Sequence, residues 1–132
     1  MPTNQSKESI GRKARRKGYA TESLAVLWLR IKGYRIIARN FVTGRGSGAG
    51  EIDIIATRGT TLAFIEVKSR KNLADAAYAI SDYSKKRISK AAEFFLSLHS
   101  EYNHYDIRFD AFLAGGKSRP IHIEDAWRND WW

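Results

Sequence analysis

Three acidic side chains and one lysine in the middle of the chain are spaced so that they could act together. Glu51 and Asp53 lie two residues apart, and Glu66 and Lys68 repeat that spacing further along. Side chains of a strand alternate between its two faces, so each pair would project from one side of a strand. Carboxylate oxygens are the ligands that magnesium prefers, and an amine can stabilise charge on a phosphate. The pattern therefore predicts a metal-assisted site for hydrolysis.

The sequence between the two pairs predicts that they lie on adjacent strands. Residues 51–56 and 62–68 are rich in β-branched and aromatic side chains, and Arg58-Gly59 between them is a turn signal. We expect a β-hairpin with a two-residue turn at Arg58-Gly59. A four-residue loop over residues 57–60 gives the same register.

This register determines which side chains meet across the hairpin. Asp53 is expected opposite Phe64 and Glu51 opposite Glu66, which leaves Asp53 and Glu66 as diagonal neighbours roughly 7 to 8 Å apart. A slip of one residue at the turn is expected to break the arrangement. Like charges opposite each other destabilise a sheet, and a hard divalent cation would resolve the conflict. Such a cation also lowers the pKa of a ligated water and neutralises charge on a phosphate oxygen. The alternative is a surface hairpin with Glu66 and Lys68 solvated at its edge.

The remaining pattern predicts an α/β domain. A first helix is expected over residues 20–32, ended by Gly33, and a second long helix lies within residues 76–98 with Ser81 as its N-cap. Besides the hairpin, we expect strands at residues 34–42, 107–113 and 121–124. The order helix, three strands, helix, two strands indicates an α/β sandwich around a mixed sheet.

The first helix carries two apolar stripes and is expected to be buried over much of its surface. One stripe consists of Ala20, Leu24, Leu27, Trp28 and Ile31, and the other of Val26 and Leu29. Glu22 aligns with the second stripe. A carboxylate on an apolar stripe is costly unless it has a partner. Its partner is expected to be either the metal site or an arginine.

The charge of the chain favours a polyanionic partner. Lys and Arg total 23 against 14 Asp and Glu, which gives a net charge of +9. We expect nucleic acid as the partner rather than an anionic membrane surface or another acidic partner. For the N-terminal basic run over residues 12–17, the alternative is that its side chains are only solvated. The candidate phosphate contacts are Arg12, Arg15, Arg16, Arg45, Arg70, Lys71, Lys85, Lys86 and Lys90.

Length and composition set further limits. The 132 residues suit one domain over residues 18–127, preceded by a basic arm over residues 1–17 and followed by a tail over residues 128–132. Cysteine is absent, which excludes disulfides and thiolate metal sites. There is no run of about 18 apolar residues, so no membrane span is expected. Cytoplasm is the expected location.

Two segments resemble the signature of the uncharacterised bacterial YraN-like family. They are GEIDIIA at residues 50–56 and FIEVKSR at residues 64–70. Further matches are GYRI at 33–36, ARNF at 38–41 and RFD at 108–110. The resemblance extends from about residue 18 to residue 127. That family in turn resembles archaeal Holliday-junction resolvases and the PD-(D/E)XK nuclease superfamily.

The resemblance implies a fold and a set of roles. The fold is a restriction-endonuclease-like (tRNA-endonuclease-like) αβββαββ sandwich, with a central mixed sheet flanked by helices. Asp53 matches the metal-binding Asp, Glu66 the second acidic ligand and Lys68 the catalytic lysine. Glu22 matches the acidic residue of the first helix that joins the metal site in the resolvase-like branch. The family commonly has Lys or Gln early in the second helix, where Ser84, Lys85 and Lys86 stand here.

The resemblance therefore implies an endonuclease that depends on Mg²⁺, with Mn²⁺ as an alternative. Its substrate would be DNA, and branched DNA by analogy with the resolvases. A homodimer follows from the same analogy. Some members of the superfamily bind without cutting, so a non-catalytic nucleic-acid-binding module with this fold is the alternative function.

Overall fold

The computed structural model describes residues 4–44 and 48–129, with side chains from residue 18 onward. The side chains of Arg12, Arg15 and Arg16, and all of Arg45, lie outside this description. The elements are α1 (Asn4–Ile31), β1 (Arg35–Phe41), β2 (Ile52–Arg58), β3 (Thr61–Arg70), α2 (Leu73–Tyr78), α3 (Asp82–Leu98), the 3-10 helix η1 (Ser100–Tyr102), β4 (Asp106–Gly115) and β5 (Ile121–Trp127). Among the described helices, none has the length and apolar content needed to cross a bilayer.

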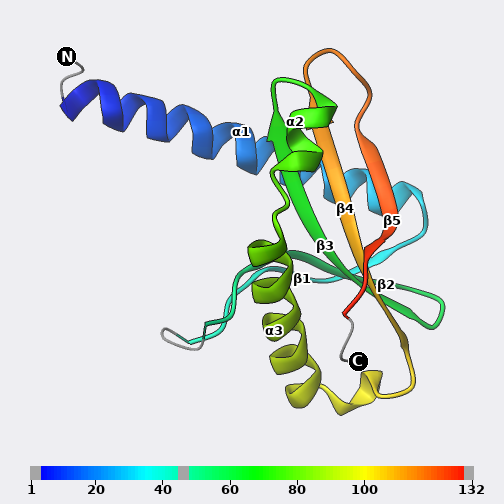
Figure 1. The fold of residues 1–132 in the computed structure, drawn as a ribbon. Helices are drawn as coiled ribbons and strands as arrows, with labels where there is room; N and C mark the ends of the chain where they lie inside the picture. Colours follow the sequence, from blue (N-terminus) through cyan, green and yellow to red (C-terminus); the bar gives the residue numbers. More distant parts are fainter. Residues whose placement is uncertain (1–3, 45–47, 130–132) are drawn as a thin grey trace.

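The five strands form one mixed sheet in the order β1-β2-β3-β4-β5 (Figure 1). Strands β3 and β4 are parallel, and the other neighbours are antiparallel. A parallel pair needs a crossover connection, and α2, α3 and η1 provide it. The predicted α/β sandwich, with a central mixed sheet flanked by helices, is confirmed. The short helix α2 is an addition that the sequence analysis did not predict.

Each face of the sheet carries its own apolar core. On one face α1 packs against alternate residues of β2, β3 and β4, and the core there includes Val26, Leu29, Ile54, Ile65 and Phe112. On the other face α3 packs against the intervening residues, and that core includes Ile55, Phe64, Ile88, Phe95 and Phe109. The alternation of apolar side chains along the strands therefore follows from burial of both faces.

Helix α1 differs from its prediction in length and in burial. It begins at Asn4 rather than at residue 20, because no proline interrupts the segment after Pro2. Among the helix side chains that the structure describes, from residue 18 onward, those of Thr21, Ala25, Val26 and Leu29 are buried. Leu27 and Ile31 are 57% and 77% exposed, so the expectation that much of the helix is buried was wrong. The sheet covers one side of α1, and among the described residues no element packs on its outer side.

The hairpin turn lies one residue further along than predicted. Arg58 pairs with Thr61, so Gly59 and Thr60 form the turn, and Ile54 pairs with Ile65. Gly59 has a φ of +60°, and a two-residue hairpin turn can require such a residue at its first central position. The predicted pairing of Asp53 with Phe64 was therefore wrong by two positions, although each side chain keeps its predicted face.

A buried polar network joins β4, β5 and α1 on the α1 face. Asp110 is fully buried, and its carboxylate accepts hydrogen bonds from Arg108 Nε and His122 Nε2, each at 2.8 Å, and from the backbone N–H of Asp125 at 3.0 Å. Burial alone would raise the pKa of Asp110, but these hydrogen bonds lower it below its usual range. Lys32 Nζ lies 2.7 Å from His122 Nδ1, so Nδ1 is the acceptor and Nε2 carries the proton.

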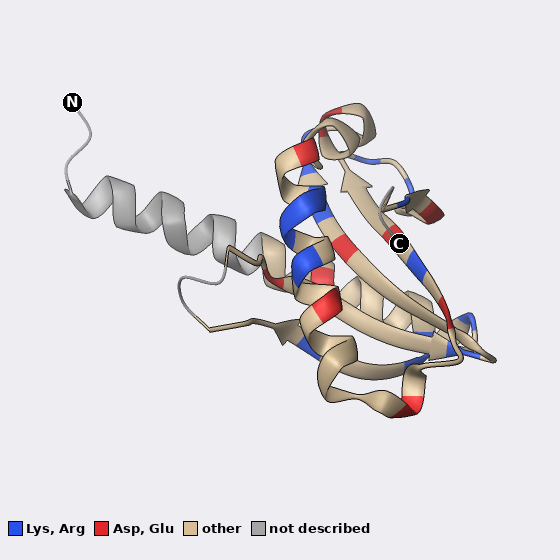
Figure 2. Cartoon of the chain, turned by 60° about the horizontal axis from the view of Figure 1, so that its bottom comes forward, with Lys and Arg blue, Asp and Glu red and all other residues tan. Residues whose placement is uncertain are grey.

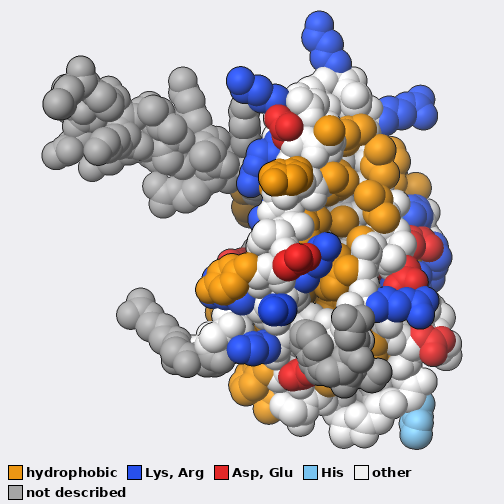
Figure 3. All heavy atoms as spheres, in the orientation of Figure 1, with side chains coloured by type: hydrophobic (Ala, Val, Ile, Leu, Met, Phe, Trp, Pro, Cys, Tyr) orange, Lys and Arg blue, Asp and Glu red, His pale blue; other side chains and the backbone are white. Residues whose placement is uncertain are grey.

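Strand β5 forms one edge of the sheet and leaves apolar side chains exposed. Ile121 and Ile123 are 43% and 38% exposed. A groove of about 160 Å³ runs between Ile123 on β5 and Ala77 and Ile80 near α2. Figure 3 shows the apolar side chains gathered on this side of the molecule. Trp127 ends the strand and stacks on Phe109, with ring centroids 5.5 Å apart.

The junction between β4 and α2 tolerates no side chain at Gly115. A Cβ at this position would lie 2.3 Å from the backbone carbon of Asn72, the residue that caps α2 by accepting a hydrogen bond from Asp75 N at 2.8 Å. Gly18 is the contrasting case, since a Cβ there has nothing within 4 Å.

We expect Gly115→Ala to lower the free energy of unfolding by roughly 1–3 kcal/mol, because backbone must move to admit the methyl group. Gly18→Ala, the matched control in α1, is expected to leave it unchanged or to raise it by up to about 1 kcal/mol. Urea denaturation followed by circular dichroism measures both. Equal stability of the two variants would contradict this account of the junction.

Candidate functional site

The hairpin register brings two of the predicted acids, Asp53 and Glu66, face to face. Because Ile54 pairs with Ile65, the next position along each strand sets Asp53 opposite Glu66. Both side chains line one cavity of about 220 Å³ on the α3 face. The Val67 N–H donates a hydrogen bond of 2.7 Å to Asp53 Oδ2. Glu66 is only 7% exposed. A carboxylate pair is thus held in a largely desolvated place.

Lys68 lines the same cavity. Its Nζ lies 3.6 Å from Glu66 Oε1, and its side chain is 25% exposed. The three residues predicted to carry the chemistry, Asp53, Glu66 and Lys68, therefore meet in one place, and one amine faces two carboxyl groups.

The two facing carboxyl groups do not both ionise easily. Burial raises the pKa of Asp53 to about 8, helped by the hydrogen bond and the negative charge of Glu66. The hydrogen bond from Val67 N–H and the charge of Lys68 act in the opposite direction but are weaker. Near neutral pH the metal-free pair therefore retains a proton between the two carboxyl groups.

Glu22 and Glu51 enlarge the acidic cluster, and Asn40 joins them. The Asn40 amide nitrogen donates hydrogen bonds of 3.1 Å to Glu22 Oε1 and 2.9 Å to Glu51 Oε1. Glu22 also hydrogen-bonds Asp53. Burial raises the pKa of both glutamates, and the charge of Asp53 raises each further. The partner that Glu22 needs is thus this cluster, while the charge of Arg39 nearby lowers its pKa.

Asn40 is a site residue for which the sequence analysis assigned no role. It has a φ of +53°, in the left-handed region that Asn tolerates better than most residues. This conformation lies within β1, beside the register shift between Ile36 and Ala38. Only its position in the ARNF match to the family drew attention to it, and no local pattern predicts a bond to Glu22 or Glu51.

The donor set of this cluster suits a hard divalent cation. It consists of carboxylate oxygens, which favour Mg²⁺ or Mn²⁺ over softer metals. Among the described residues, no three acidic or histidine side chains already converge on one point as a formed metal site. The hydrogen bonds between Asp53 and Glu66, and from Asn40, occupy these oxygens instead. A cation would take the place of the shared proton and offset the repulsion between these carboxyl groups.

Helix α3 closes the cavity with Ser84 and Arg87. Ser81 caps the helix, as predicted, by accepting a hydrogen bond from Ser84 N at 3.1 Å. Ser84, Lys85 and Lys86 stand where the family commonly has Lys or Gln, and of these three residues Ser84 lines the acidic cavity. Lys85 points elsewhere, because it lines the apolar groove beside β5 and its Nζ lies 3.8 Å from Asp82 Oδ1.

Arg87 is a second residue whose role the sequence did not predict. Its backbone oxygen accepts a hydrogen bond of 2.9 Å from Gly50 N, and its Nη2 donates one of 3.2 Å to Ala49 O. A Cβ at Gly50 would lie 3.0 Å from Arg87 Cβ, so this approach requires the small residue. Arg87 thus holds the chain just before Glu51 and Asp53 against α3.

The predicted phosphate contacts that the structure describes fall into two groups. Arg70 and Lys71 follow Lys68 at the end of β3, and Lys86 and Lys90 lie on α3. Figure 2 shows basic segments of α3 beside the acidic segments of the sheet. Lys85 is the exception described above. Positive charge thus lies on both sides of a negative cavity.

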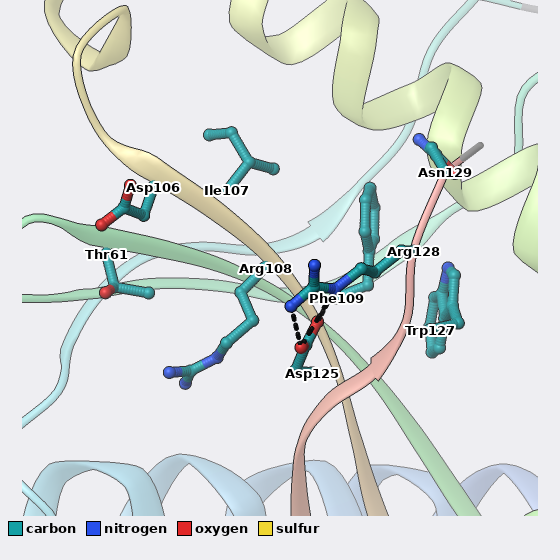
Figure 4. Close-up of a pocket in the computed structure, with 9 residues that line it drawn as sticks. All are labelled: Thr61, Asp106, Ile107, Arg108, Phe109, Asp125, Trp127, Arg128 and Asn129. Atoms are coloured by element: carbon teal, nitrogen blue, oxygen red, sulfur yellow. Dashed lines mark hydrogen bonds and ion pairs between the residues drawn. The ribbon is translucent and has the colours of Figure 1, made fainter. Parts of the chain in front are cut away.

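A second cavity, of about 430 Å³, lies near the hairpin end of β3 between β4 and β5 (Figure 4). Both arginines that line it are paired with carboxylates: Arg128 Nη2 lies 2.8 Å from Asp125 Oδ2, and Arg108 Nε lies 2.8 Å from Asp110 Oδ1. None of the predicted site residues lines it. Its larger size therefore does not make it the site of the predicted chemistry.

The raised pKa of Asp53 predicts how the stability of metal-free protein depends on pH. An unfolded Asp titrates near pH 3.9, whereas folded Asp53 holds its proton to about pH 8. Between these values the folded state binds more protons, so this residue makes the free energy of unfolding fall as the pH rises. We expect Asp53→Asn to remove this contribution and to be more stable than the wild type above pH 8. Thermal melts in chelator from pH 5 to pH 9 measure the difference, and parallel curves for the two proteins would contradict it.

The chain is similar in sequence to proteins of one bacterial family and similar in structure to a solved protein. A solved structure of Hjc, a Holliday junction resolvase of Archaeoglobus fulgidus, aligns with a TM-score of 0.48 and 18% identity over 86% of this chain and 83% of that chain. A UPF0102 protein of Paramagnetospirillum magneticum is 47% identical over 117 residues, which are 89% of this chain and 91% of the relative. One of Bradyrhizobium diazoefficiens is 44% identical over 108 residues, 82% and 78% of the two chains. The model of the uncharacterised protein family UPF0102 matches residues 21–113. The chain belongs to this family, which confirms the resemblance predicted from its signature residues.

Proposed function

We propose that this protein is a metal-dependent endonuclease that hydrolyses phosphodiester bonds in DNA. The observation that carries the proposal is the contact between the carboxyl groups of Asp53 and Glu66 with the Lys68 amine beside them. This is the combination of acids and lysine that the PD-(D/E)XK nucleases share. The sequence resemblance to that superfamily supports the same reading.

The distribution of charge supports a cation in the cavity. The chain as a whole carries a net charge of +9, yet Glu22, Glu51, Asp53 and Glu66 gather beside one another. Such a cluster repels a phosphate backbone that the surrounding Lys and Arg residues attract. A bound Mg²⁺, or Mn²⁺, removes this conflict. Asp53 and Glu66 would hold it, and Glu22 would complete its ligands.

Each residue of the proposed site then has a defined role. The metal, when bound, supplies positive charge and Lewis acidity at the phosphate. Lys68 donates to a phosphate oxygen and stabilises the charge that develops there. Asn40 keeps Glu22 and Glu51 in place, and Arg87 fixes the segment that leads into β2. Arg70, Lys71, Lys86 and Lys90 hold the backbone of the strand that is cut.

The rival function is a nucleic-acid-binding module that keeps the fold without cutting. It predicts salt-dependent binding to DNA and no metal-dependent turnover. A homodimer and a branched DNA substrate stay predictions from the family resemblance, and a cytoplasmic location stays a prediction from the sequence.

We expect purified protein to nick branched DNA in the presence of Mg²⁺ or Mn²⁺. Asp53→Asn, which keeps the size of the side chain, is expected to lower the rate by at least about 100-fold, because a group that stabilises the transition state is lost. Lys68→Met is expected to have an effect of the same order. Gel analysis of end-labelled strands under single-turnover conditions measures both.

Glu101→Gln is the matched control, since Glu101 is an exposed acid on η1, away from the acidic cavity. It should cut like the wild type. Equal nicking by Asp53→Asn would show that a contaminant cuts the DNA. Binding by the wild type without any nicking, on branched and linear DNA, would favour the rival function.

A further inference from the structure

A large cavity beside the acidic site takes no part in the proposed reaction. It measures about 720 Å³ and lies between the α1 residues Gly18 and Thr21, the end of β3 and Gly116. Lys68 lines both this cavity and the acidic cavity. The two spaces are therefore neighbours that share one wall, and the shared residue is the lysine assigned to the phosphate.

The rim of this cavity is basic, and the charges on it are available. Arg70 and Lys71 line it next to Lys68. Among the described residues neither Arg70 nor Lys71 has an ion-pair partner, and Arg70 Nη1 donates only to its neighbour's carbonyl, Ser69 O, at 2.7 Å. Cations that lack a carboxylate partner are suited to a phosphate.

The rest of the lining is small and largely uncharged. Gly18, Ala20 and Gly116 offer backbone and methyl surface, and Val67 contributes apolar side chain. Gly116 has a φ of +60°, and a Cβ there would lie 2.7 Å from Lys71 O, so this stretch of wall cannot carry a larger residue. A wall of small, mostly uncharged residues beside basic side chains suits a nucleobase together with its phosphate.

We propose that this cavity receives an unpaired nucleotide next to the phosphodiester bond that is cut. The inference rests on the proposed function. The phosphate of this nucleotide would lie between Arg70 and Lys71, and its base would lie against the wall that contains Gly18 and Gly116. A base stacked and paired within a duplex cannot enter such a cavity without leaving the stack. The substrate class is therefore DNA with an unpaired nucleotide at the cut, as in a flap, a gap or a branch point.

The first test compares two DNA substrates that share one sequence, a fully paired duplex and the same duplex with one unpaired nucleotide at the cut. We expect wild-type protein to cut the second with a kcat/KM at least tenfold higher. Gly18→Trp places a large side chain where a Cβ meets nothing within 4 Å, so it fills space without displacing the core. This variant is expected to lose that tenfold preference. Leu27→Trp, on the exposed outer side of α1, is the matched control and should keep it.

A second pair of variants tests the rim independently of the filled wall. Arg70→Gln combined with Lys71→Gln is expected to weaken binding of the unpaired substrate about tenfold and of the paired duplex less than threefold. Arg35→Gln, an exposed cation at the start of β1, controls for loss of charge in general. Equal losses on both substrates would reduce these residues to general phosphate contacts and overturn the proposal.

A free deoxynucleoside monophosphate distinguishes a strand site from a mononucleotide site. We expect no competition at millimolar concentration, because the strand is held on both sides of the cavity. Full competition would assign the cavity to a free nucleotide and overturn the inference. If wild type cuts both substrates equally, the inference fails while the nuclease stands. If it cuts neither, the proposed function itself fails.

Discussion

The carboxyl groups of Asp53 and Glu66 are held against each other by the backbone, and the rest of the site is arranged around that contact. Antiparallel pairing of β2 and β3 sets the two residues opposite one another, and the neighbouring apolar pairs, Ile54 with Ile65 and Ile55 with Phe64, fix the register. Two ionised carboxylates at such a position would destabilise the sheet. In the metal-free protein a shared proton relieves the repulsion. The proposed cation would take the place of that proton.

Several distant segments each contribute one part to this contact. Helix α1 brings Glu22, β1 brings Asn40, and α3 brings Arg87 to the loop before β2. None of these residues is near the others in sequence, so the site exists only when the domain is folded. Helix α1 covers one face of the sheet and α3 the other, and both helices contribute residues to the acidic site.

The sequence predicted the parts of the site that depend on local periodicity. The alternation of side chains placed Asp53, Glu66 and Lys68 on one face, and this stayed correct although the turn moved by one residue. A shift of the turn by one residue changes the pairing by two positions, so no side chain changes face, contrary to the expected disruption. The register depends on which of the two turn positions Gly59 occupies. The sequence analysis placed Gly59 at the second turn position, whereas its positive φ belongs to the first.

Other features of the fold lay beyond local reasoning. Nothing in its neighbours predicts that Asn40 adopts a φ of +53° and joins two glutamates on other elements. The exposure of Leu27 and Ile31 depends on what packs outside α1, which periodicity does not report. Lys85 was grouped with its basic neighbours, yet its side chain turns to the apolar groove beside β5. In each case the deciding contact is distant in sequence.

The central claim is that this carboxylate pair exchanges its proton for a single divalent cation. Calorimetric titration of Mn²⁺ at pH 7, repeated in two buffers of different ionisation enthalpy, measures the affinity and the number of protons released together. We predict one site, a net release of protons, and loss of at least about tenfold in affinity for Glu66→Gln but not for Glu101→Gln. Binding with equal affinity by wild type and Glu66→Gln, or without proton release, would contradict it.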